Sequence, residues 1–170
     1  RVFINEMEFI KNMEIKELSY YINQAKIIKP ENHKNKIRIA FVGSFTLNGF
    51  EETMQVQCND EKINCITYNS PYNQFNQEIL NEDSNLYKFK PDIILVDRQR
   101  HFGLDAIKEK IPLIIHLRGN YWKEMKTARK TIYKSLPKQV ALNAWEKIGE
   151  ECFKGAQIIV PICKYLDEIT

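Results

Sequence analysis

The sequence predicts an α/β fold in which a parallel sheet is covered by helices on both faces. Five short, almost continuously apolar runs are typical of strands that are buried on both sides. Segments whose apolar residues recur at helical spacing separate these runs. Because crossovers between parallel strands are right-handed, the chain should form a Rossmann-like, doubly wound sheet, with 3-2-1-4-5 as the expected strand order.

The chain should begin with a helical extension over residues 1–30. Apolar residues recur at helical spacing from Asn5 to about Ile28, and the polar, proline-containing segment 29–36 indicates a linker. The Rossmann-like domain follows over residues 37–170. We expect the extension to serve packing or pairing rather than chemistry.

Each element of the domain follows from a local pattern. "IRIAFVG", "INCITY", "PDIILV", "PLIIHL" and "AQIIVP" are the five apolar runs. The last long helical region should break near Pro137, because proline interrupts a helix interior. Strands are therefore expected at 37–43, 63–68, 91–96, 112–117 and 156–161, and helical segments at 47–61, 76–89, 104–110 and 122–154, with another helix from 162.

Composition narrows the possible functions. Lysine and arginine exceed aspartate and glutamate by only 25 to 22 in 170 residues, which is too weak an excess to indicate nucleic-acid binding. The four cysteines form no CxxC pair and have no histidine at metal-ligand spacing, so we expect reduced thiols, no metal and no cofactor. No apolar run is long enough to span a membrane, and no signal peptide is evident, which favours a cytoplasmic location. The start at Arg1 and the end inside a predicted helix suggest part of a longer protein.

The first candidate site is the loop "GSFTLNG", directly after the first predicted strand. Gly43 would let the backbone approach a ligand, while Ser44 and Thr46 would supply hydroxyl donors near a helix N-terminus that attracts anions. A tight turn with an ordinary helix cap is an equally good interpretation. The loop lacks the GxGxxG pattern, which disfavours dinucleotide binding.

The second candidate site is "RGNYW", after the fourth predicted strand. Arg118 suits phosphate or carboxylate, and Trp122 offers a flat face to a sugar. An ion pair beside aromatics that cap the sheet is the alternative. We favour ligand binding because Arg118, Gly119 and Asn120 together are poor core material.

Other polar residues at the same predicted edge are less specific. Asp97 and Arg98 follow the third strand, where a solvated loop is as good an interpretation as a ligand site. His116 lies inside the fourth strand, where a histidine is more often a hydrogen-bonded core residue than a catalyst. The amide-rich segment 68–78 suits either hydroxyl-rich ligands or a plain loop. No Ser-His-Asp set or DxD pair is visible, so no catalytic residue is assigned.

Residues 90–125 and 155–169 resemble the N-terminal domain of GT-B glycosyltransferases of the family 4 type. The likeness rests on "KPDIILVDRQRHFGLDAIKEKIPLIIHLRGNYWKEM" and "GAQIIVPICKYLDEI". Arg118-Gly119-Asn120 stands where that family often has His-Gly-Asp, and Cys163 where it usually has serine. The resemblance implies an acceptor-side domain, inactive alone, whose own C-terminal domain would bind a nucleotide-sugar donor. The sugar would pass to a hydroxyl acceptor, and peripheral membrane association would suit a lipid-linked acceptor.

Residues 37–58 and 68–96 also resemble the N-terminal segment of FkbH-like proteins, which are HAD-related enzymes that load glyceryl groups onto carrier proteins. The likeness rests on "IRIAFVGSFTLNGFEETMQVQC" and "YNSPYNQFNQEILNEDSNLYKFKPDIILV". The DxDxT phosphatase signature of that class is absent from this sequence. A non-catalytic α/β binding or regulatory module is the remaining alternative, and the oligomeric state is left open.

Overall fold

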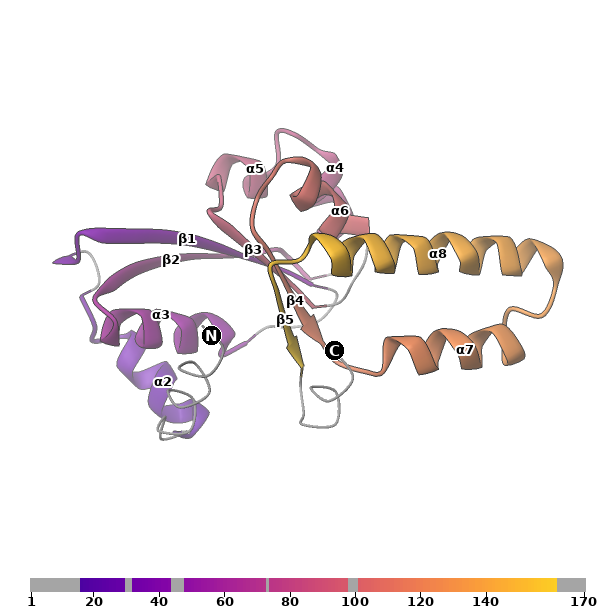
Figure 1. Ribbon diagram of the computed structural model, residues 1–170. Helices are drawn as coiled ribbons and strands as arrows, with labels where there is room; N and C mark the ends of the chain where they lie inside the picture. The colour runs from indigo at the N-terminus through magenta and orange to yellow at the C-terminus, as the bar shows by residue number, and fades with distance from the viewer. Residues whose placement is uncertain (1–15, 30–31, 44–47, 73, 98–100, 162–170) are drawn as a thin grey trace, which may run out of the picture.

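The computed structural model describes residues 16–29, 32–43, 48–72, 74–97 and 101–161, and these form an α/β structure around one sheet (Figure 1). All strand pairings in the sheet are parallel. The strands are β1 (Asn35–Val42), β2 (Ile63–Asn69), β3 (Ile93–Val96), β4 (Leu113–Leu117) and β5 (Ile158–Pro161). The predicted fold class is therefore confirmed.

The strand order is β2-β1-β3-β4-β5, so the expected order 3-2-1-4-5 is wrong. β3 occupies the position beside β1 that the expected order gives to β4. In this pairing Ile39 lies opposite Ile93 and Val42 lies opposite Val96. The order 2-1-3-4-5 also belongs to a doubly wound sheet, and its direction of winding reverses between β1 and β3. Loops after β1 and β3, rather than after β1 and β4, therefore flank the switch point.

Helices cover both faces of the sheet (Figure 1). On one face, α3 packs on β1 and β2 around buried Phe41 and Cys65. The other face carries the larger core, in which Val42, Val96 and Ile115 meet residues of four helices. The helices are α2 (Leu18–Ala25), α3 (Phe50–Asp60), α4 (Phe75–Leu80), α5 (Asn85–Phe89), α6 (His101–Lys108), α7 (Tyr121–Thr131) and α8 (Leu136–Gly155).

The described part of the N-terminal extension packs on the domain. In α2, Tyr21 is 8% exposed, and its hydroxyl accepts a hydrogen bond from Nε2 of Gln57 in α3 at 3.1 Å. Residues 1–15 lie outside the described residues. The contact between α2 and α3 therefore agrees with a packing role for the described part of the extension.

The helices α7 and α8 form a hairpin that extends away from the sheet (Figure 1). The predicted long helical region is divided after Thr131, and Pro137 lies in the first turn of α8, where its missing N–H has no helical partner to lose. Near the base of the hairpin, Gly149 lies against the ring of Tyr121. None of the described helices is long and apolar enough to cross a membrane.

Candidate functional site

The switch point brings together the loops that follow β1 and β3. Buried Gly43 follows β1, and Asp97 follows β3 with only 1% of its surface exposed. The backbone N–H of Asp97 donates to the carbonyl of Val42 at 3.3 Å, which continues the pairing of these strands to their carboxyl ends. The predicted site residues Ser44, Thr46 and Arg98 lie outside the described residues.

Polar side chains lie at the carboxyl edge of the sheet, most of them on the face covered by α3, with Ser70 directly after the end of β2. We call Glu51, Thr67, Asn69, Ser70, Asp97 and His116 the carboxyl-edge cluster. Side chains alternate between the two faces of a strand, so Thr67 and Asn69 follow Cys65 onto the α3 face of β2. The same alternation places Asp97 beyond Leu95 of β3 and His116 beyond Ile114 of β4.

Glu51, in the first turn of α3, anchors this helix to β2. Its Oε1 accepts a hydrogen bond from the hydroxyl of Thr67, and its Oε2 accepts one from Nδ2 of Asn69 at 2.5 Å. Nε2 of Gln55 donates to the same Thr67 hydroxyl at 2.9 Å. A carboxylate in the first turn of a helix is also favoured by the helix dipole. These bonds fix the orientation of the Asn69 amide.

Two buried polar atoms in the cluster have no hydrogen-bond partner among the described residues. They are Oδ1 of Asn69 and Oγ of Ser70. The backbone of Ser70 is held by the bond from its N–H to the carbonyl of Phe41, at 2.9 Å. Leaving a buried polar atom without a partner costs about 1–3 kcal/mol, so such atoms are candidates for contact with a ligand or with ordered water.

His116 is half-buried between this edge and α3, with its ring centroid 5.9 Å from that of Phe50. Burial lowers the pKa of His116, the positive charge of Arg118 lowers it further, and Asp97 acts in the opposite direction. The imidazole is therefore held mainly neutral near pH 7, so that one ring nitrogen donates and the other accepts.

The residues of "RGNYW" lie on the far side of β3 from Gly43, since β3 separates β1 from β4. The side chain of Asn120 caps α7 by accepting a bond from the N–H of Lys123 at 2.9 Å. Trp122 is 44% exposed and stacks on Phe153 of α8, with centroids 5.3 Å apart. Both side chains thus have structural roles in the hairpin. The premise that β1 and β4 are neighbours is wrong, since β3 lies between them. The expected convergence of this loop with residues 43–46 stays a prediction, because residues 44–46 lie outside the described residues.

Gly119 and Arg118 complete that loop. A Cβ atom at Gly119 would come within 2.2 Å of Oε1 of Glu124, so a larger residue would displace that carboxylate. Arg118 is exposed at the end of β4, two residues beyond His116. A ligand role for these two residues stays a prediction.

Sequence reasoning missed Glu51 and Thr67 and treated Asn69 and Ser70 only as part of a polar loop. The available signal was the period-two pattern of "INCITYN", which places Thr67 and Asn69 on one strand face. Among the described residues, no three histidine, cysteine, aspartate or glutamate side chains are grouped to hold a metal ion. The cluster is therefore a set of hydroxyl, amide, carboxylate and imidazole groups suited to hydrogen-bonding a polar ligand.

No family model matches the chain, and a search of curated proteins found no significant match. A solved structure described as the N-terminal part of the protein BF1531 from Bacteroides fragilis, containing a phosphatase domain complexed with Mg, is similar in fold. The TM-score is 0.60 and the sequence identity is 12%, over 91% of this chain and 47% of that one. The chain thus spans about half the length of the solved chain it matches.

This comparison corrects the glycosyltransferase expectation. The similar structure contains a phosphatase domain and is not described as a GT-B enzyme. The assignment as a GT-B acceptor-side domain was therefore wrong, and with it the expected transfer of a sugar from a nucleotide-sugar donor. Apolar α/β strands of the type "IILV" and "PLIIHL" recur in many doubly wound sheets, which explains the misleading resemblance.

Proposed function

We propose that this chain is the α/β segment of an FkbH-like enzyme, a class related to the HAD phosphatases, and that the carboxyl-edge cluster holds a small hydroxyl-rich group. In fold, 91% of the chain is similar to part of a longer chain that contains a phosphatase domain. The sequence resemblance over 37–58 and 68–96 supports the same class. Because the DxDxT signature is absent, phosphoryl chemistry would belong to another domain of the enzyme.

The observation that carries the ligand proposal is the pair of unpartnered buried atoms, Oδ1 of Asn69 and Oγ of Ser70. An amide oxygen accepts from a hydroxyl group, and a serine hydroxyl both donates and accepts. Asp97 and the mainly neutral His116 add an acceptor and a second donor–acceptor group at the same edge. This chemistry matches a glyceryl group, which has adjacent hydroxyls and little apolar surface.

The test uses the purified chain with glycerate and glycerol as probes, measured by calorimetry and by amide chemical shifts. In Ser70→Ala, binding should weaken about fivefold, which corresponds to one hydrogen bond of about 1 kcal/mol. The free variant should lose no stability, since the deleted hydroxyl has no partner among the described residues. Ser135→Ala, at the start of α8 where the serine makes no side-chain cap bond, is the matched control.

Equal binding of both probes by wild type and Ser70→Ala would contradict the ligand proposal, as would a loss of stability in Ser70→Ala without any loss of binding. A separate assay tests whether this chain itself carries phosphatase activity. The chain alone should release no phosphate from p-nitrophenyl phosphate in the presence of Mg²⁺. Phosphate release by this chain would place a phosphatase centre within it and contradict the assignment of that chemistry to another domain.

A further inference from the structure

The outer end of the α7–α8 hairpin projects beyond every other labelled element (Figure 1). We call residues 130–140 the hairpin tip; they comprise the end of α7, the connection to α8 and the start of α8. In the view of Figure 1 the tip lies at the far right, and no other described helix or strand lies beside it. The tip is therefore free to meet a partner outside the domain.

Three aliphatic side chains of the tip are exposed. Ile132, Leu136 and Val140 are 64%, 79% and 68% exposed. Residues four apart share one face of a helix, so Leu136 and Val140 lie on the same side of α8. Leu142, which is 1% exposed, lies on the opposite side from Val140, since two residues rotate about 200° around the helix axis. The buried side of α8 is thus occupied without Leu136 and Val140, and their exposure serves no packing within the described structure.

The tip also carries all of the chain's formal net charge. Its exposed lysines are Lys130, Lys134 and Lys138. No aspartate or glutamate occurs in residues 125–145, and the next carboxylate, Glu146, pairs with Arg129. Among the described residues, no carboxylate forms an ion pair with any of the three lysines. The whole chain carries a formal +3, which equals the charge of the tip, so the remaining residues are formally neutral in sum.

Unpaired lysines beside exposed aliphatic groups fit an anionic membrane surface better than other acidic partners. A phosphate backbone would attract the lysines but leave the aliphatic side chains in water, and single-stranded nucleic acids are bound by stacking on aromatic rings. The tip has one aromatic ring, Tyr133, which is only partly exposed. Stable protein complexes bury about 800 Å² on each partner, usually over a broad face, whereas lipid headgroups can surround a small projecting tip on all sides.

We propose that the hairpin tip docks on membrane surfaces that contain anionic lipid. Ile132, Leu136 and Val140 enter the boundary between headgroups and acyl chains, and the three lysines contact the lipid phosphate and carboxylate groups. The long lysine side chains allow both contacts at once, because their hydrocarbon stems lie along apolar surface while the ammonium groups stay in water. This surface is remote from the carboxyl-edge cluster, and the inference does not rest on the function proposed there.

The experiment measures co-sedimentation of the purified chain with two kinds of vesicle, phosphatidylcholine alone and phosphatidylcholine mixed with phosphatidylserine. We expect binding to the mixed vesicles to be at least about tenfold tighter and to weaken as salt is added. Changing Lys130, Lys134 and Lys138 to Gln should weaken it about a hundredfold at low salt, since each lysine near an anionic surface contributes about fivefold. Leu136→Gln with Val140→Gln should weaken it at least about tenfold although every charge is kept.

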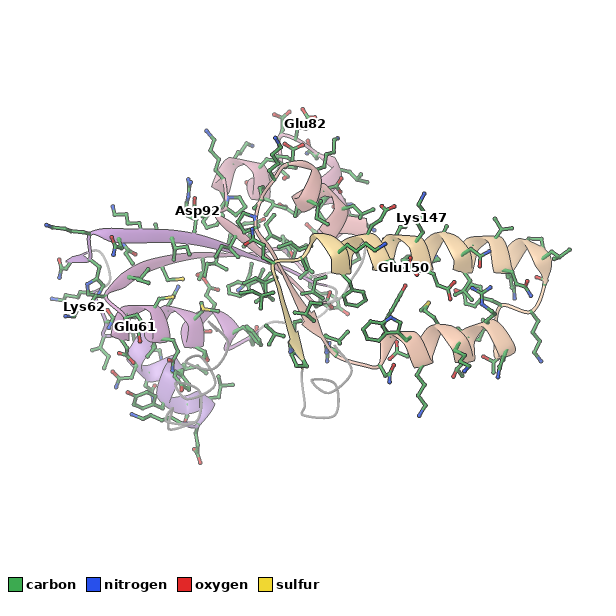
Figure 2. All side chains as sticks on the ribbon, viewed as in Figure 1. Glu61, Lys62, Glu82, Asp92, Lys147 and Glu150 are labelled. Atoms are coloured by element: carbon green, nitrogen blue, oxygen red, sulfur yellow. The ribbon has the colours of Figure 1, made fainter. Side chains whose placement is uncertain are left out.

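Matched variants separate the tip from general surface properties. Lys34→Gln, Lys36→Gln and Lys62→Gln together remove three exposed lysines from the opposite end of the molecule, where Figure 2 shows Lys62. Ile27→Gln with Leu80→Gln replaces two apolar side chains that are 65% and 78% exposed elsewhere. Both controls should bind mixed vesicles within about twofold of wild type. Melting temperatures of all variants should match that of wild type, because the substituted side chains are exposed.

Four results would overturn the proposal. They are no binding to mixed vesicles, equal binding to neutral and mixed vesicles, losses in the control variants equal to those in the tip variants, and a preference for nucleic acid. Single-stranded poly(U) and duplex DNA are the probes for the last result. Binding to either probe that depends on the three lysines but not on Leu136 and Val140, without binding to vesicles, would assign the tip to nucleic acid instead.

Discussion

Glu51 of α3 and Asn69 of β2 are joined by a hydrogen bond of 2.5 Å between Oε2 of the carboxylate and Nδ2 of the amide. A carboxylate accepts only, so the amide nitrogen must face it and the amide oxygen must face away. The bond therefore decides the orientation of Asn69 and directs its Oδ1 to a buried position without a described partner. One pair of residues thus anchors a helix and orients the amide oxygen that the proposed ligand would contact.

The first prediction concerns the anchoring role of Glu51. Glu51→Ala should lower the free energy of unfolding by about 1–3 kcal/mol, because Thr67 and Asn69 lose their acceptor. Glu61→Ala, at the other end of α3, is the control and should change it by less than about 0.5 kcal/mol. Urea unfolding measures both. Equal effects of the two substitutions would show that the Glu51 bonds contribute nothing specific.

The second prediction concerns the base of the α7–α8 hairpin. A Cβ atom at Gly149 would come within 2.3 Å of Oη and 2.5 Å of Cζ of Tyr121. Gly149→Ala should therefore destabilise the protein by about 1–3 kcal/mol through overpacking, although alanine is the better helix former. The control is Ala144→Gly at an exposed position of α8, which measures helix propensity alone. A higher melting temperature in Gly149→Ala would contradict the close packing of Tyr121 on α8.

The third prediction concerns pH. Because burial and Arg118 lower the pKa of His116 in the folded state, protonation favours the unfolded state. The stability contributed by neutral His116 is fully present above the unfolded pKa of about 6.5 and is lost as pH falls through the folded value. Between about pH 7.5 and about pH 5, wild type should lose more stability than His116→Gln.

Thermal melting across this pH range measures the effect. Val140→Ala, at an exposed position of α8 that carries no titratable group, is the control and should keep the pH dependence of wild type. The same slope in wild type and His116→Gln would show that His116 does not gain a proton on unfolding.

The sequence predicted the parallel sheet well because five apolar strands separated by helices allow few other folds. It did not predict which strands are neighbours. "IILV" of β3 and "LIIHL" of β4 are both mainly apolar, yet only β3 pairs with β1. Hydrophobic pattern determines that a strand is buried, whereas its position in the sheet depends on packing between distant segments.

The roles of the polar side chains in the candidate site were likewise hard to predict from the sequence. Asn120 was predicted to bind a ligand, yet it precedes a helical run and caps it, which is the commoner use of asparagine there. The role of Asn69 depends on a contact with Glu51, eighteen residues away in sequence. Residues 44–46 and Arg98, on which much of the prediction rested, lie outside the described residues.

The last prediction concerns Glu78, a carboxylate only 8% exposed that holds the end of β2 to α4 and α5. Its Oε2 accepts bonds from the hydroxyl of Tyr68 at 2.8 Å and from the N–H of Leu86 at 2.9 Å. Burial and the neighbouring Glu78 raise the pKa of Tyr68, so the phenol stays protonated and remains a donor at neutral pH.

Glu78→Ala should lower the free energy of unfolding by about 2–3 kcal/mol, because it leaves the part-buried Tyr68 hydroxyl and the buried Leu86 N–H without an acceptor. Glu78→Gln keeps an acceptor oxygen and should cost less than about 1.5 kcal/mol. Combining Glu78→Ala with Tyr68→Phe should cost less than the sum of the two, since the phenylalanine removes one of the unsatisfied donors. Urea unfolding of wild type, Glu78→Ala, Tyr68→Phe and the double variant, with Glu82→Ala as an exposed control, measures this coupling. Strict additivity would mean that the two side chains do not interact in the folded protein, and that α4 is held to β2 by apolar packing alone.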